Sequence, residues 1–426
     1  LIETVTGYEL HKVIDENGLK WLKTAAYPVV IDPSMQTIED AWESSGLTRY
    51  WQYFQNLREF VNPATGHLTI TQTDLVIPER GLDLTISRVH QTPAVFYGIE
   101  PYDYEAPPVN IGKGWQLDFP YIGDKYLHLW GGTVYKIEWD GNQFINHVGT
   151  HFILIKNGDS THTLTTASGT VCEFAASGVL TQIKDIDQNT ITFGYSGGTL
   201  TTITDTIGRQ VTLSYSGSYL HKILYNNCEI EYSYDEYGRL VLMDDFLDRR
   251  TSYSYCPYCT GCTFSYWLLS EIEYPTTGYT EYTYGCYPDG DYSRYAVTNQ
   301  KVYETNQVRH AAFSYTGSFQ WFSSSTVTVK NESDITKGSF DFTIGNYSLI
   351  TEKVVKNASG TALRKYGYTY NSMRDITEQK AYYDGSTLSY TDYYHYDNWG
   401  NAIYIKNAEG HESFFSYANT STSGYF

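Results

Sequence analysis

The sequence has little of what a helical, nucleic-acid-binding or membrane-spanning protein needs. Of its 426 residues only 3 are methionine and 18% are charged, and no run of lysine and arginine interrupts a formal net charge of -19. A surface of this sign repels a phosphate backbone, so we expect no nucleic-acid partner. No stretch approaches the roughly 18 apolar residues of a helix that crosses a bilayer, so we expect no membrane span in this chain.

Common catalytic motifs are also missing. The sequence contains no H-E-x-x-H, P-loop or G-x-G-x-x-G pattern, and these patterns position zinc ions and phosphates. The 11 histidines are scattered singly, and the 48 acidic residues give no reason to prefer any one pair for glycosidase chemistry. We therefore predict that the chain is not an enzyme. Because it begins at Leu1 rather than methionine, we expect it to be a piece of something longer.

Tyrosine is present in excess, with 43 copies against 18 phenylalanines and 9 tryptophans. Such usage favours strands over helices. Residues 1–60 are interpreted as an irregular connecting segment, with a weak helical signal at 38–42. From 61 to 179, alternating runs between Pro and Gly turns predict antiparallel strands with one buried face. These strands are expected at 68–73, 82–88, 116–119, 134–139, 151–155 and 170–174.

Residues 180–426 form a repeat whose marker is an aromatic residue (once leucine), any residue, and then tyrosine. Tyr195, Tyr215, Tyr234 and Tyr255 follow one another at steps of 20, 19 and 21 residues. A period of this length fits one two-stranded hairpin per unit. The markers are Phe193-Gly194-Tyr195, Leu213-Ser214-Tyr215, Tyr232-Ser233-Tyr234, Tyr253-Ser254-Tyr255, Tyr282-Thr283-Tyr284, Phe313-Ser314-Tyr315, Tyr368-Thr369-Tyr370, Tyr394-His395-Tyr396 and Phe415-Ser416-Tyr417.

The cleanest copy of the repeat explains its residue types. Tyr234 ends a strand, Asp235 can accept hydrogen bonds from the backbone of the turn, Gly238 supplies a positive φ, and Arg239 restarts a strand. Tyrosines two residues apart lie on one face of a strand. We therefore expect successive units to arrange rings and phenol hydroxyls in a ladder.

These motifs resemble the YD-repeat family, which includes bacterial Rhs proteins, the shells of insecticidal toxin complexes, and teneurins. The resemblance covers about residue 60 to the end of the sequence. It rests on Tyr234-Asp235-x-x-Gly238-Arg239-Leu240, Tyr396-Asp397-x-x-Gly400-Asn401, Gly208-Arg209, the leading segments 61–68, 78–84 and 112–115, and Arg88.

The resemblance implies an all-β fold, in which an antiparallel array of β-hairpins spirals into a shell or an open barrel. We expect a connecting segment at 1–60, a β-rich leading domain of Rhs type at 61–179 and the YD-repeat array at 180–426. The chain departs from the complete family pattern, since it has neither the Asp-Pro-containing autoproteolytic ending of Rhs proteins nor a toxin domain. Nine units are also few for a closed shell, so closure is expected from missing chain or from neighbouring subunits.

Because the chain has a repeat array and no recognisable catalytic constellation, we predict a non-catalytic structural scaffold that works outside the cell or on its surface. The alternative is the shell portion of a polymorphic toxin or adhesin whose cargo domain is not in this chain. A more remote alternative is a carbohydrate-binding or carbohydrate-active protein, because aromatic β surfaces often bind sugars. The expected partners are further copies, other parts of a longer chain, or surface glycans.

One segment departs from the repeat. Cys256-Pro257-Tyr258-Cys259-Thr260-Gly261-Cys262 lies where the spacing stretches to 29 residues, and Cys286 follows 24 residues after Cys262. Thiolates at this spacing can hold a structural zinc ion, or an iron–sulfur cluster in a reducing setting. Disulfides are the alternative in a secreted protein, and free thiols are the third. No other cofactor is expected.

Acidic turns and sequons complete the candidate sites. Asp185 to Asn189 has the first spacing of a calcium loop, but Thr190 replaces the turn glycine, so we interpret it as a hairpin turn. The acidic pairs 244–245 and 289/291 are likewise interpreted as solvated turns rather than calcium sites. The candidate glycosylation sites are Asn331, Asn346, Asn357 and Asn419.

Overall fold

The computed structural model divides into two compact units, Leu1–Ala41 and Trp42–Phe426. In the first unit it describes one hairpin, β1 (Ile2–Thr4) and β2 (Gly7–Glu9), with Ile2 opposite Glu9. The expected helical signal at 38–42 lies outside the described residues. Those residues are 2–4, 7–9, 57–92, 105–145, 151–256, 268–289, 292–304, 307–317, 322–331, 333–397, 400–407 and 409–416.

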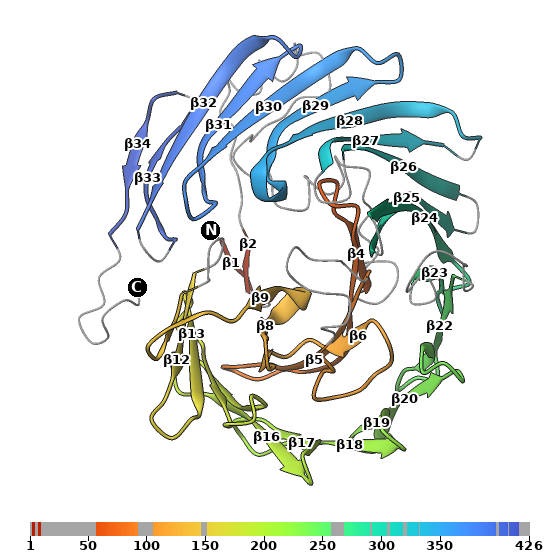
Figure 1. Ribbon diagram of the computed structural model, residues 1–426, viewed down its shortest axis with the longest axis vertical. Helices are drawn as coiled ribbons and strands as arrows, with labels where there is room; N and C mark the ends of the chain where they lie inside the picture. The colour runs from red at the N-terminus through yellow and green to blue at the C-terminus, as the bar shows by residue number, and fades with distance from the viewer. Residues whose placement is uncertain are drawn as a thin grey trace. The chain divides into compact units, whose positions relative to one another are not determined.

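The second unit is built from antiparallel sheets, and each strand pairs with its neighbour in sequence (Figure 1). Across the described ranges there is no α-helix, and two short 3-10 turns occur at Trp130–Gly132 and Asn346–Ser348. The predicted all-β hairpin fold is therefore confirmed. A four-stranded sheet contains β3 (Leu57–Val61), β4 (Leu68–Ile77), β5 (Leu84–Gln91) and β6 (Trp115–Leu117), and a three-stranded sheet contains β7 (Tyr121–Ile122), β8 (Tyr126–His128) and β9 (Val134–Lys136).

A 25-stranded sheet, which we call the repeat sheet, holds all the remaining strands in sequence order. It extends across residue 179 without a break in strand pairing, while the domain boundaries at 60 and 179 stay predictions. Its strands are β10 (Trp139–Asp140), β11 (Gln143–Phe144), β12 (Phe152–Lys156), β13 (His162–Thr166), β14 (Val171–Phe174), β15 (Leu180–Lys184), β16 (Thr190–Ser196), β17 (Thr199–Thr204), β18 (Gln210–Ser216), β19 (Tyr219–Tyr225), β20 (Cys228–Tyr234), β21 (Leu240–Asp244), β22 (Arg250–Tyr255), β23 (Leu269–Glu273), β24 (Tyr279–Asp289), β25 (Tyr292–Glu304), β26 (Gln307–Gly317), β27 (Phe322–Lys330), β28 (Thr336–Ile344), β29 (Ile350–Asn357), β30 (Ala362–Tyr370), β31 (Ile376–Tyr383), β32 (Thr387–Tyr396), β33 (Ala402–Lys406) and β34 (Glu412–Phe414).

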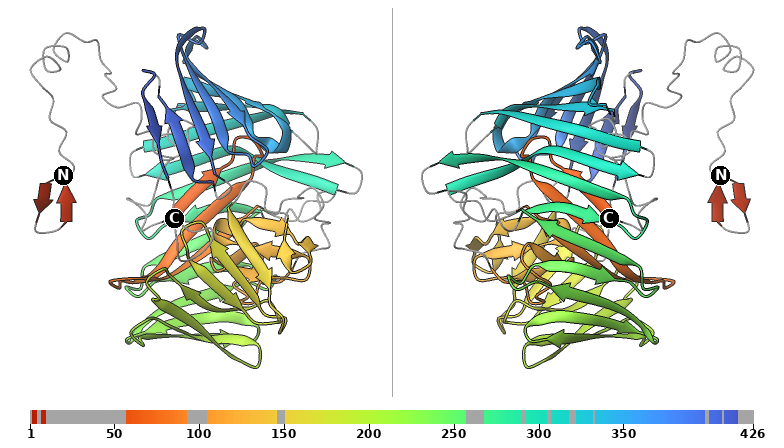
Figure 2. Two further views of the ribbon diagram at one scale, coloured as in Figure 1. Left: turned by 90° about the vertical axis from the view of Figure 1, so that its left-hand side faces the viewer. Right: turned by 90° about the vertical axis from the view of Figure 1, so that its right-hand side faces the viewer.

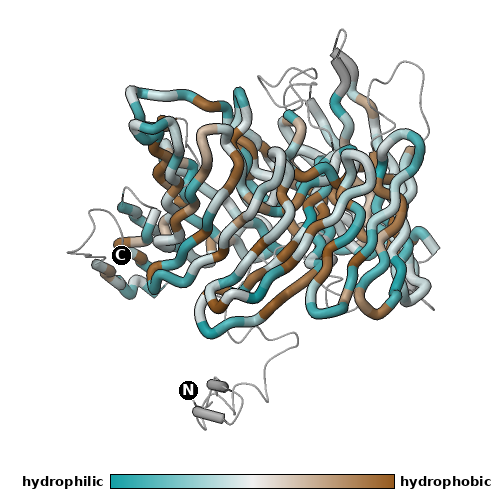
Figure 3. The backbone as a smooth tube through the Cα atoms, turned by 90° about the horizontal axis from the view of Figure 1, so that it is seen from below, coloured by the Kyte–Doolittle hydropathy of each residue, from teal (hydrophilic) through white to brown (hydrophobic). Residues whose placement is uncertain are grey.

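Alternation of apolar and polar residues creates one buried face on most of these strands. Leu68 and Ile70 of β4 are fully buried, and the intervening Thr69 is half-buried. Figure 3 shows the same alternation along the repeat strands. One continuous core joins the four-stranded sheet to the repeat sheet, because Leu68 and Ile70 belong to the same packed cluster as Tyr232 and Tyr253.

The repeat sheet changes character along its length. Strands β15 to β23 have five to seven residues, whereas β24 to β26 have 11 to 13 (Figure 2). No residue of β29 or β33 is buried over the length that the structure describes. The apolar core thus belongs mainly to the leading strands and the earlier repeats, and the last strands contribute few buried side chains among the described residues, such as Tyr366 and Ala381.

Among the described residues, no helix is long and apolar enough to cross a membrane.

Candidate functional site

The repeat turn has the geometry that its sequence predicts. Asp235 Oδ1 accepts hydrogen bonds from the backbone N–H of Tyr237 at 3.0 Å and of Arg239 at 2.9 Å. Arg239 Nε donates to Asp235 Oδ2 at 2.7 Å, and Gly238 has a φ of 73°. A side chain at Gly238 would also meet the hydroxyl of Tyr219. One aspartate therefore organises the turn, and glycine meets both its backbone and its packing requirement.

The same turn recurs along the repeat sheet. Asp205 Oδ1 accepts from the backbone N–H of Arg209 at 2.8 Å, and Asp397 Oδ1 accepts from that of Asn401 at 2.9 Å. Asp185 Oδ1 accepts from that of Asn189 at 2.8 Å, so the interpretation of this segment as a hairpin turn is correct. Gly400 of the second YD motif has a φ of 77°.

The acidic pair at Asp244 and Asp245 also serves the repeat. Asp245 Oδ1 accepts from the backbone N–H of Leu247 at 2.8 Å, and its Oδ2 accepts from Arg249 Nε at 2.8 Å. Asp244 accepts two hydrogen bonds from Arg250, both at 2.8 Å. Both carboxylates thus have arginine partners, Asp244 as the last residue of β21 and Asp245 as the first residue of the turn that follows. The other acidic pair, 289/291, lies where side chains are not described.

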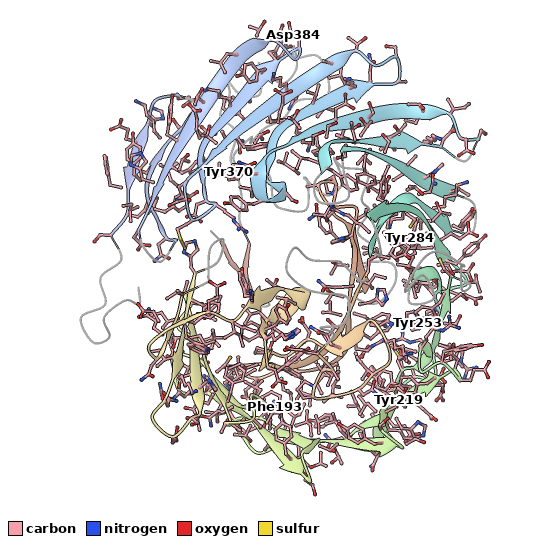
Figure 4. The ribbon with its side chains drawn as sticks, in the orientation of Figure 1. Phe193, Tyr219, Tyr253, Tyr284, Tyr370 and Asp384 are labelled. Carbon is pink, nitrogen blue, oxygen red and sulfur yellow. The ribbon has the colours of Figure 1, made fainter. Side chains whose placement is uncertain are left out.

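The marker tyrosines form the predicted ladder, and their hydroxyls bond to backbone carbonyls of the neighbouring strand. Tyr215 donates to the carbonyl of Leu200 at 2.7 Å, and Leu200 is itself opposite Tyr195 at a β-bulge. Tyr284 and Tyr370, labelled in Figure 4, donate to the carbonyls of Leu269 at 2.8 Å and Ile350 at 2.6 Å.

In the part of the chain that the structure describes, the phenol–carbonyl pairs are Tyr195–Leu180, Tyr215–Leu200, Tyr234–Leu220, Tyr255–Leu240, Tyr284–Leu269, Tyr315–Val297, Tyr370–Ile350 and Tyr396–Ile376. In each pair, the residue that supplies the carbonyl also pairs with the strand before it, and that pairing contains a β-bulge next to this residue. We call this set the phenol ladder.

The ladder hydroxyls remain protonated donors at neutral pH. Burial raises the pKa of Tyr215 to about 12, and burial also raises the pKa of Tyr195 and Tyr234. A β-bulge interrupts the regular backbone hydrogen bonding between two strands. The phenol hydroxyl donates a hydrogen bond to a backbone carbonyl at that interruption. Each such bond contributes on the order of 1 kcal/mol, so the ladder acts through repetition.

A buried ion pair joins the leading strands to the repeat sheet. Arg88 of β5 and Asp74 of β4 are fully buried at their side chains, and Arg88 Nε donates to Asp74 Oδ2 at 2.6 Å. Arg88 Nη2 donates to Gln72 Oε1 at 2.6 Å and contacts the hydroxyl of Tyr253 at 3.0 Å. Tyr232 donates to Asp74 Oδ2 at 2.7 Å. We call these residues the arginine junction.

Aromatic rings surround the guanidinium of the junction. Its carbon lies 4.9 Å from the ring centre of Trp115, 5.4 Å from that of Tyr232 and 5.6 Å from that of Tyr253. Burial works to lower the pKa of Arg88, but Asp74, Tyr253 and Tyr232 together outweigh it and the net shift is upward, so the guanidinium stays charged. Trp115 Nε1 donates to the hydroxyl of Tyr255 at 3.0 Å, which extends the contact to a ladder tyrosine.

Each leading segment singled out in the sequence docks onto the repeat sheet. In the 112–115 segment, the Lys113 N–H donates to the carbonyl of Gly238 at 3.1 Å. In the 78–84 segment, the Pro78 carbonyl accepts from Arg209 Nη2 at 2.9 Å. In the 61–68 segment, the Gly66 carbonyl accepts from the Val297 N–H at 2.8 Å. The leading strands are therefore held at several separate repeat units.

The cysteine segment is only partly described. Cys256 directly follows β22, and its N–H donates to the carbonyl of Leu268 at 2.8 Å. Cys286 is exposed on β24, opposite Tyr295, and Cys259 and Cys262 lie outside the described residues. The described residues contain no group of three His, Cys, Asp or Glu side chains placed to hold a metal. Zinc, disulfide and free thiol all stay predictions here.

Three of the four sequon asparagines are described. Asn331 Oδ1 accepts from the backbone N–H of Ile335 at 2.9 Å, and Asn357 Oδ1 accepts from that of Thr361 at 2.9 Å. These two occupy the turn position that aspartate holds elsewhere. Asn346 is exposed in a 3-10 turn, and Asn419 lies beyond the described residues. Glycosylation stays a prediction at all four.

Sequence reasoning did not find the buried polar residues of the leading strands. Gln72 and Asp74 occupy the next buried positions of β4 after Leu68 and Ile70. A polar residue at a position where the alternation predicts an apolar one is the sequence signal that could have identified them. Glu59 of β3 is a further case, because Glu59 Oε2 accepts from Gln300 Nε2 at 2.9 Å. Burial raises the pKa of Glu59 to about 7.

No protein-family model and no curated protein matches the chain significantly. Among solved structures, a chain in a crystal structure of TcdB2-TccC3-TEV is similar at 10% identity and a TM-score of 0.32, over 82% of this chain and 24% of that chain. The Photorhabdus luminescens Tc holotoxin pore is similar at 9% identity and a TM-score of 0.25, over 80% of this chain and 22% of that chain. A porin-like protein from Bacteroides uniformis has 10% identity and a TM-score of 0.21, over 60% of this chain and 91% of that chain. The chain spans about a quarter of the length of the first two.

Proposed function

We propose that the chain is a non-catalytic structural scaffold of the YD-repeat type that works outside the cell or on its surface. The observation that carries this proposal is the phenol ladder, in which one tyrosine per repeat period bonds its strand to the strand before it, at the bulge that faces the preceding unit. The buried polar groups described above serve packing between strands, as the arginine junction does. A wall built from such units needs no catalytic group.

Purified protein tests the scaffold directly. We expect no hydrolysis of a panel of β- and α-linked glycans, peptides and esters, and we expect ordered assemblies by electron microscopy at high concentration. Hydrolysis of any glycan that disappears on replacing one carboxylate would refute the non-catalytic part and revive the carbohydrate-active alternative.

Assembly is proposed through the ends of the repeat sheet. Strands β10 and β34 are its outermost strands, and all three residues of β34 are exposed. An outer strand has backbone groups that another strand can pair with. The partner is a second copy or another part of a longer chain. A strictly monomeric species in light scattering across a hundredfold range of concentration would count against pairing between copies.

A second candidate is the shell portion of a toxin or adhesin. The sparsely packed strands favour it, because β29 and β33 contain no buried residue in their described length. Such a surface remains available to a polypeptide held against it. Reading the gene beyond the codon for Phe426 separates the two candidates. A variable toxin domain there supports the shell, whereas further repeats or an anchoring segment support the scaffold.

A further inference from the structure

Tyr279 and Tyr303 form a stacked pair of phenol rings on the repeat sheet. The two residues lie directly opposite each other on β24 and β25, at the end of this hairpin that is farther from its turn. Their ring centres are 4.2 Å apart and their planes differ by 11°, so the rings are in van der Waals contact. Both residues are half-buried, and a small oxidant in solvent can therefore reach them.

The hydrogen-bond partner of Tyr303 distinguishes this pair from other tyrosine contacts. Two further tyrosine pairs are in ring contact within the described ranges, Tyr219–Tyr234 at 4.7 Å and Tyr287–Tyr315 at 6.4 Å between ring centres. In those pairs the hydroxyls of Tyr234 and Tyr315 donate to backbone carbonyls of the phenol ladder. A backbone carbonyl does not take up a proton at neutral pH, whereas Tyr303 donates to a carboxylate oxygen, Glu281 Oε2, at 2.8 Å.

Glu281 provides a place for the phenol proton when Tyr303 is oxidised. Burial and the Glu281 carboxylate raise the pKa of Tyr303 to about 12, so this phenol is protonated at neutral pH and its oxidation has to release a proton. The carboxylate that accepts the hydrogen bond is placed to take that proton. Glu271 on β23 and Lys301 on β25 lie directly opposite Glu281, and Asp334 also acts on Tyr303. These neighbours together are net negative, which favours a proton on the carboxylate.

We propose that Tyr279 and Tyr303 are an oxidative crosslinking site, at which a haem peroxidase and hydrogen peroxide join the two rings into a dityrosine that ties β24 to β25. Each phenol loses one electron and its hydroxyl proton, which passes from Tyr303 to Glu281 and from Tyr279 to water. The two radicals form one carbon–carbon bond between ring carbons next to the hydroxyl-bearing carbons, and each bonded carbon then gives up its hydrogen as a proton while its ring oxygen regains one. The two electrons and two protons reduce one hydrogen peroxide to two water molecules. The site needs this pair and an oxidant, so it does not rest on the proposed scaffold.

Brief treatment of the purified protein with a haem peroxidase and hydrogen peroxide tests the site. Cleavage after lysine and arginine releases residues 302–309, in which Tyr303 is the sole tyrosine, and residues 251–294, which contain Tyr279. We expect these two peptides to appear joined as one species that has lost two hydrogen atoms and has dityrosine fluorescence, and fragmentation should place the bond at Tyr279. The reaction is also run on an equal mixture of isotope-labelled and unlabelled protein. A bond within one chain gives no mixed-isotope product, whereas a mostly mixed product would contradict the tie between β24 and β25.

Five variants separate the pair from its surroundings, and circular dichroism confirms that each one folds. Tyr279→Phe and Tyr303→Phe should each abolish the joined peptide. Tyr383→Phe is the matched control, because this tyrosine is 70% exposed and has no place in the pair, and it should leave the yield unchanged. Glu281→Gln keeps an acceptor but takes no proton, and it should slow the crosslink about tenfold or more. Glu271→Gln removes the same charge from the neighbouring strand and should change the rate less than about twofold.

The rates at the different tyrosine pairs decide the proposal. Crosslinking at Tyr279 and Tyr303 should be the first product, ahead of any product from Tyr219 and Tyr234. No joined peptide from residues 251–294 and 302–309 would overturn the site, as would a product from Tyr219 and Tyr234 that forms at least as fast. Equal rates in the Glu281→Gln and Glu271→Gln proteins would contradict the role of Glu281 as the proton acceptor.

Discussion

Removing Arg88 should destabilise the protein far more than its single side chain suggests. In Arg88→Met, Asp74 loses its 2.6 Å ion pair, and Gln72 loses a 2.6 Å hydrogen bond. The carboxylate then remains fully buried with Tyr232 as its remaining donor. Breaking a buried pair in this way costs about 3–5 kcal/mol of the free energy of unfolding.

The ion pair itself is not expected to contribute that much. Replacing both members with apolar residues of similar size is often neutral, because no charge is left buried. The double variant Asp74→Leu/Arg88→Met should therefore recover at least half of the loss, although Tyr232 loses its acceptor. Arg250→Ala is the matched surface control, since the Arg250 side chain is 60% exposed beside Asp244, and it should cause no measurable change.

Urea denaturation followed by tryptophan fluorescence and far-ultraviolet circular dichroism measures these differences. Coincident transitions by the two probes would justify a single free energy of unfolding. The reasoning fails if Arg88→Met loses less than about 1 kcal/mol, or if the double variant is as unstable as the single one.

Three further predictions follow from the turns and buried groups. Asp235→Ala should cost about 1–3 kcal/mol of unfolding free energy by urea denaturation, because it removes the acceptor of two backbone N–H groups, whereas Asp235→Asn should cost less, since asparagine holds this position at Asn357. Gly238→Ala should lower the melting temperature in calorimetry, because φ is 73° and a methyl group meets Tyr219; an unchanged value would contradict that geometry. Burial raises the pKa of Glu59 from 4.5 to about 7, so the folded state holds its proton more tightly, and the contribution of Glu59 to stability should be fully present below pH 4.5 and be lost as the pH rises through 7. Glu59→Gln should remove that slope in denaturation curves, and an unaltered slope would assign it to other groups.

The sequence predicts the repeat well because its information is local. The aspartate, the positive-φ glycine and the marker tyrosine lie within a few residues of one another, as in Tyr234, Asp235 and Gly238, and a hairpin turn is a local structure. The Asp185 turn was predicted correctly for the same reason. The positions of strands such as β4, β12 and β14 followed from period-two alternation.

The contacts between distant segments could not be predicted in the same way. Tyr253 lies 165 residues after Arg88 in sequence, and no local pattern says which strand a buried arginine will meet. The bulge at Asp74 is also invisible in the alternation, because Leu68, Ile70, Gln72 and Asp74 keep one phase up to the bulge. The acceptors of the phenol ladder are backbone carbonyls, which carry no residue-type signal.

The phenol ladder is the most direct test of the account, because the proposed scaffold depends on the bonds that the ladder makes between successive strands. The triple variant Tyr195→Phe/Tyr215→Phe/Tyr234→Phe removes three hydroxyls of the ladder and keeps the rings. Its amide hydrogen exchange is compared with that of the unmodified protein. The account predicts faster exchange throughout β15 to β21 and a loss of about 3 kcal/mol in total, with β29 to β32 unchanged. Exchange rates equal to those of the unmodified protein would show that the hydroxyls do not hold the repeat together.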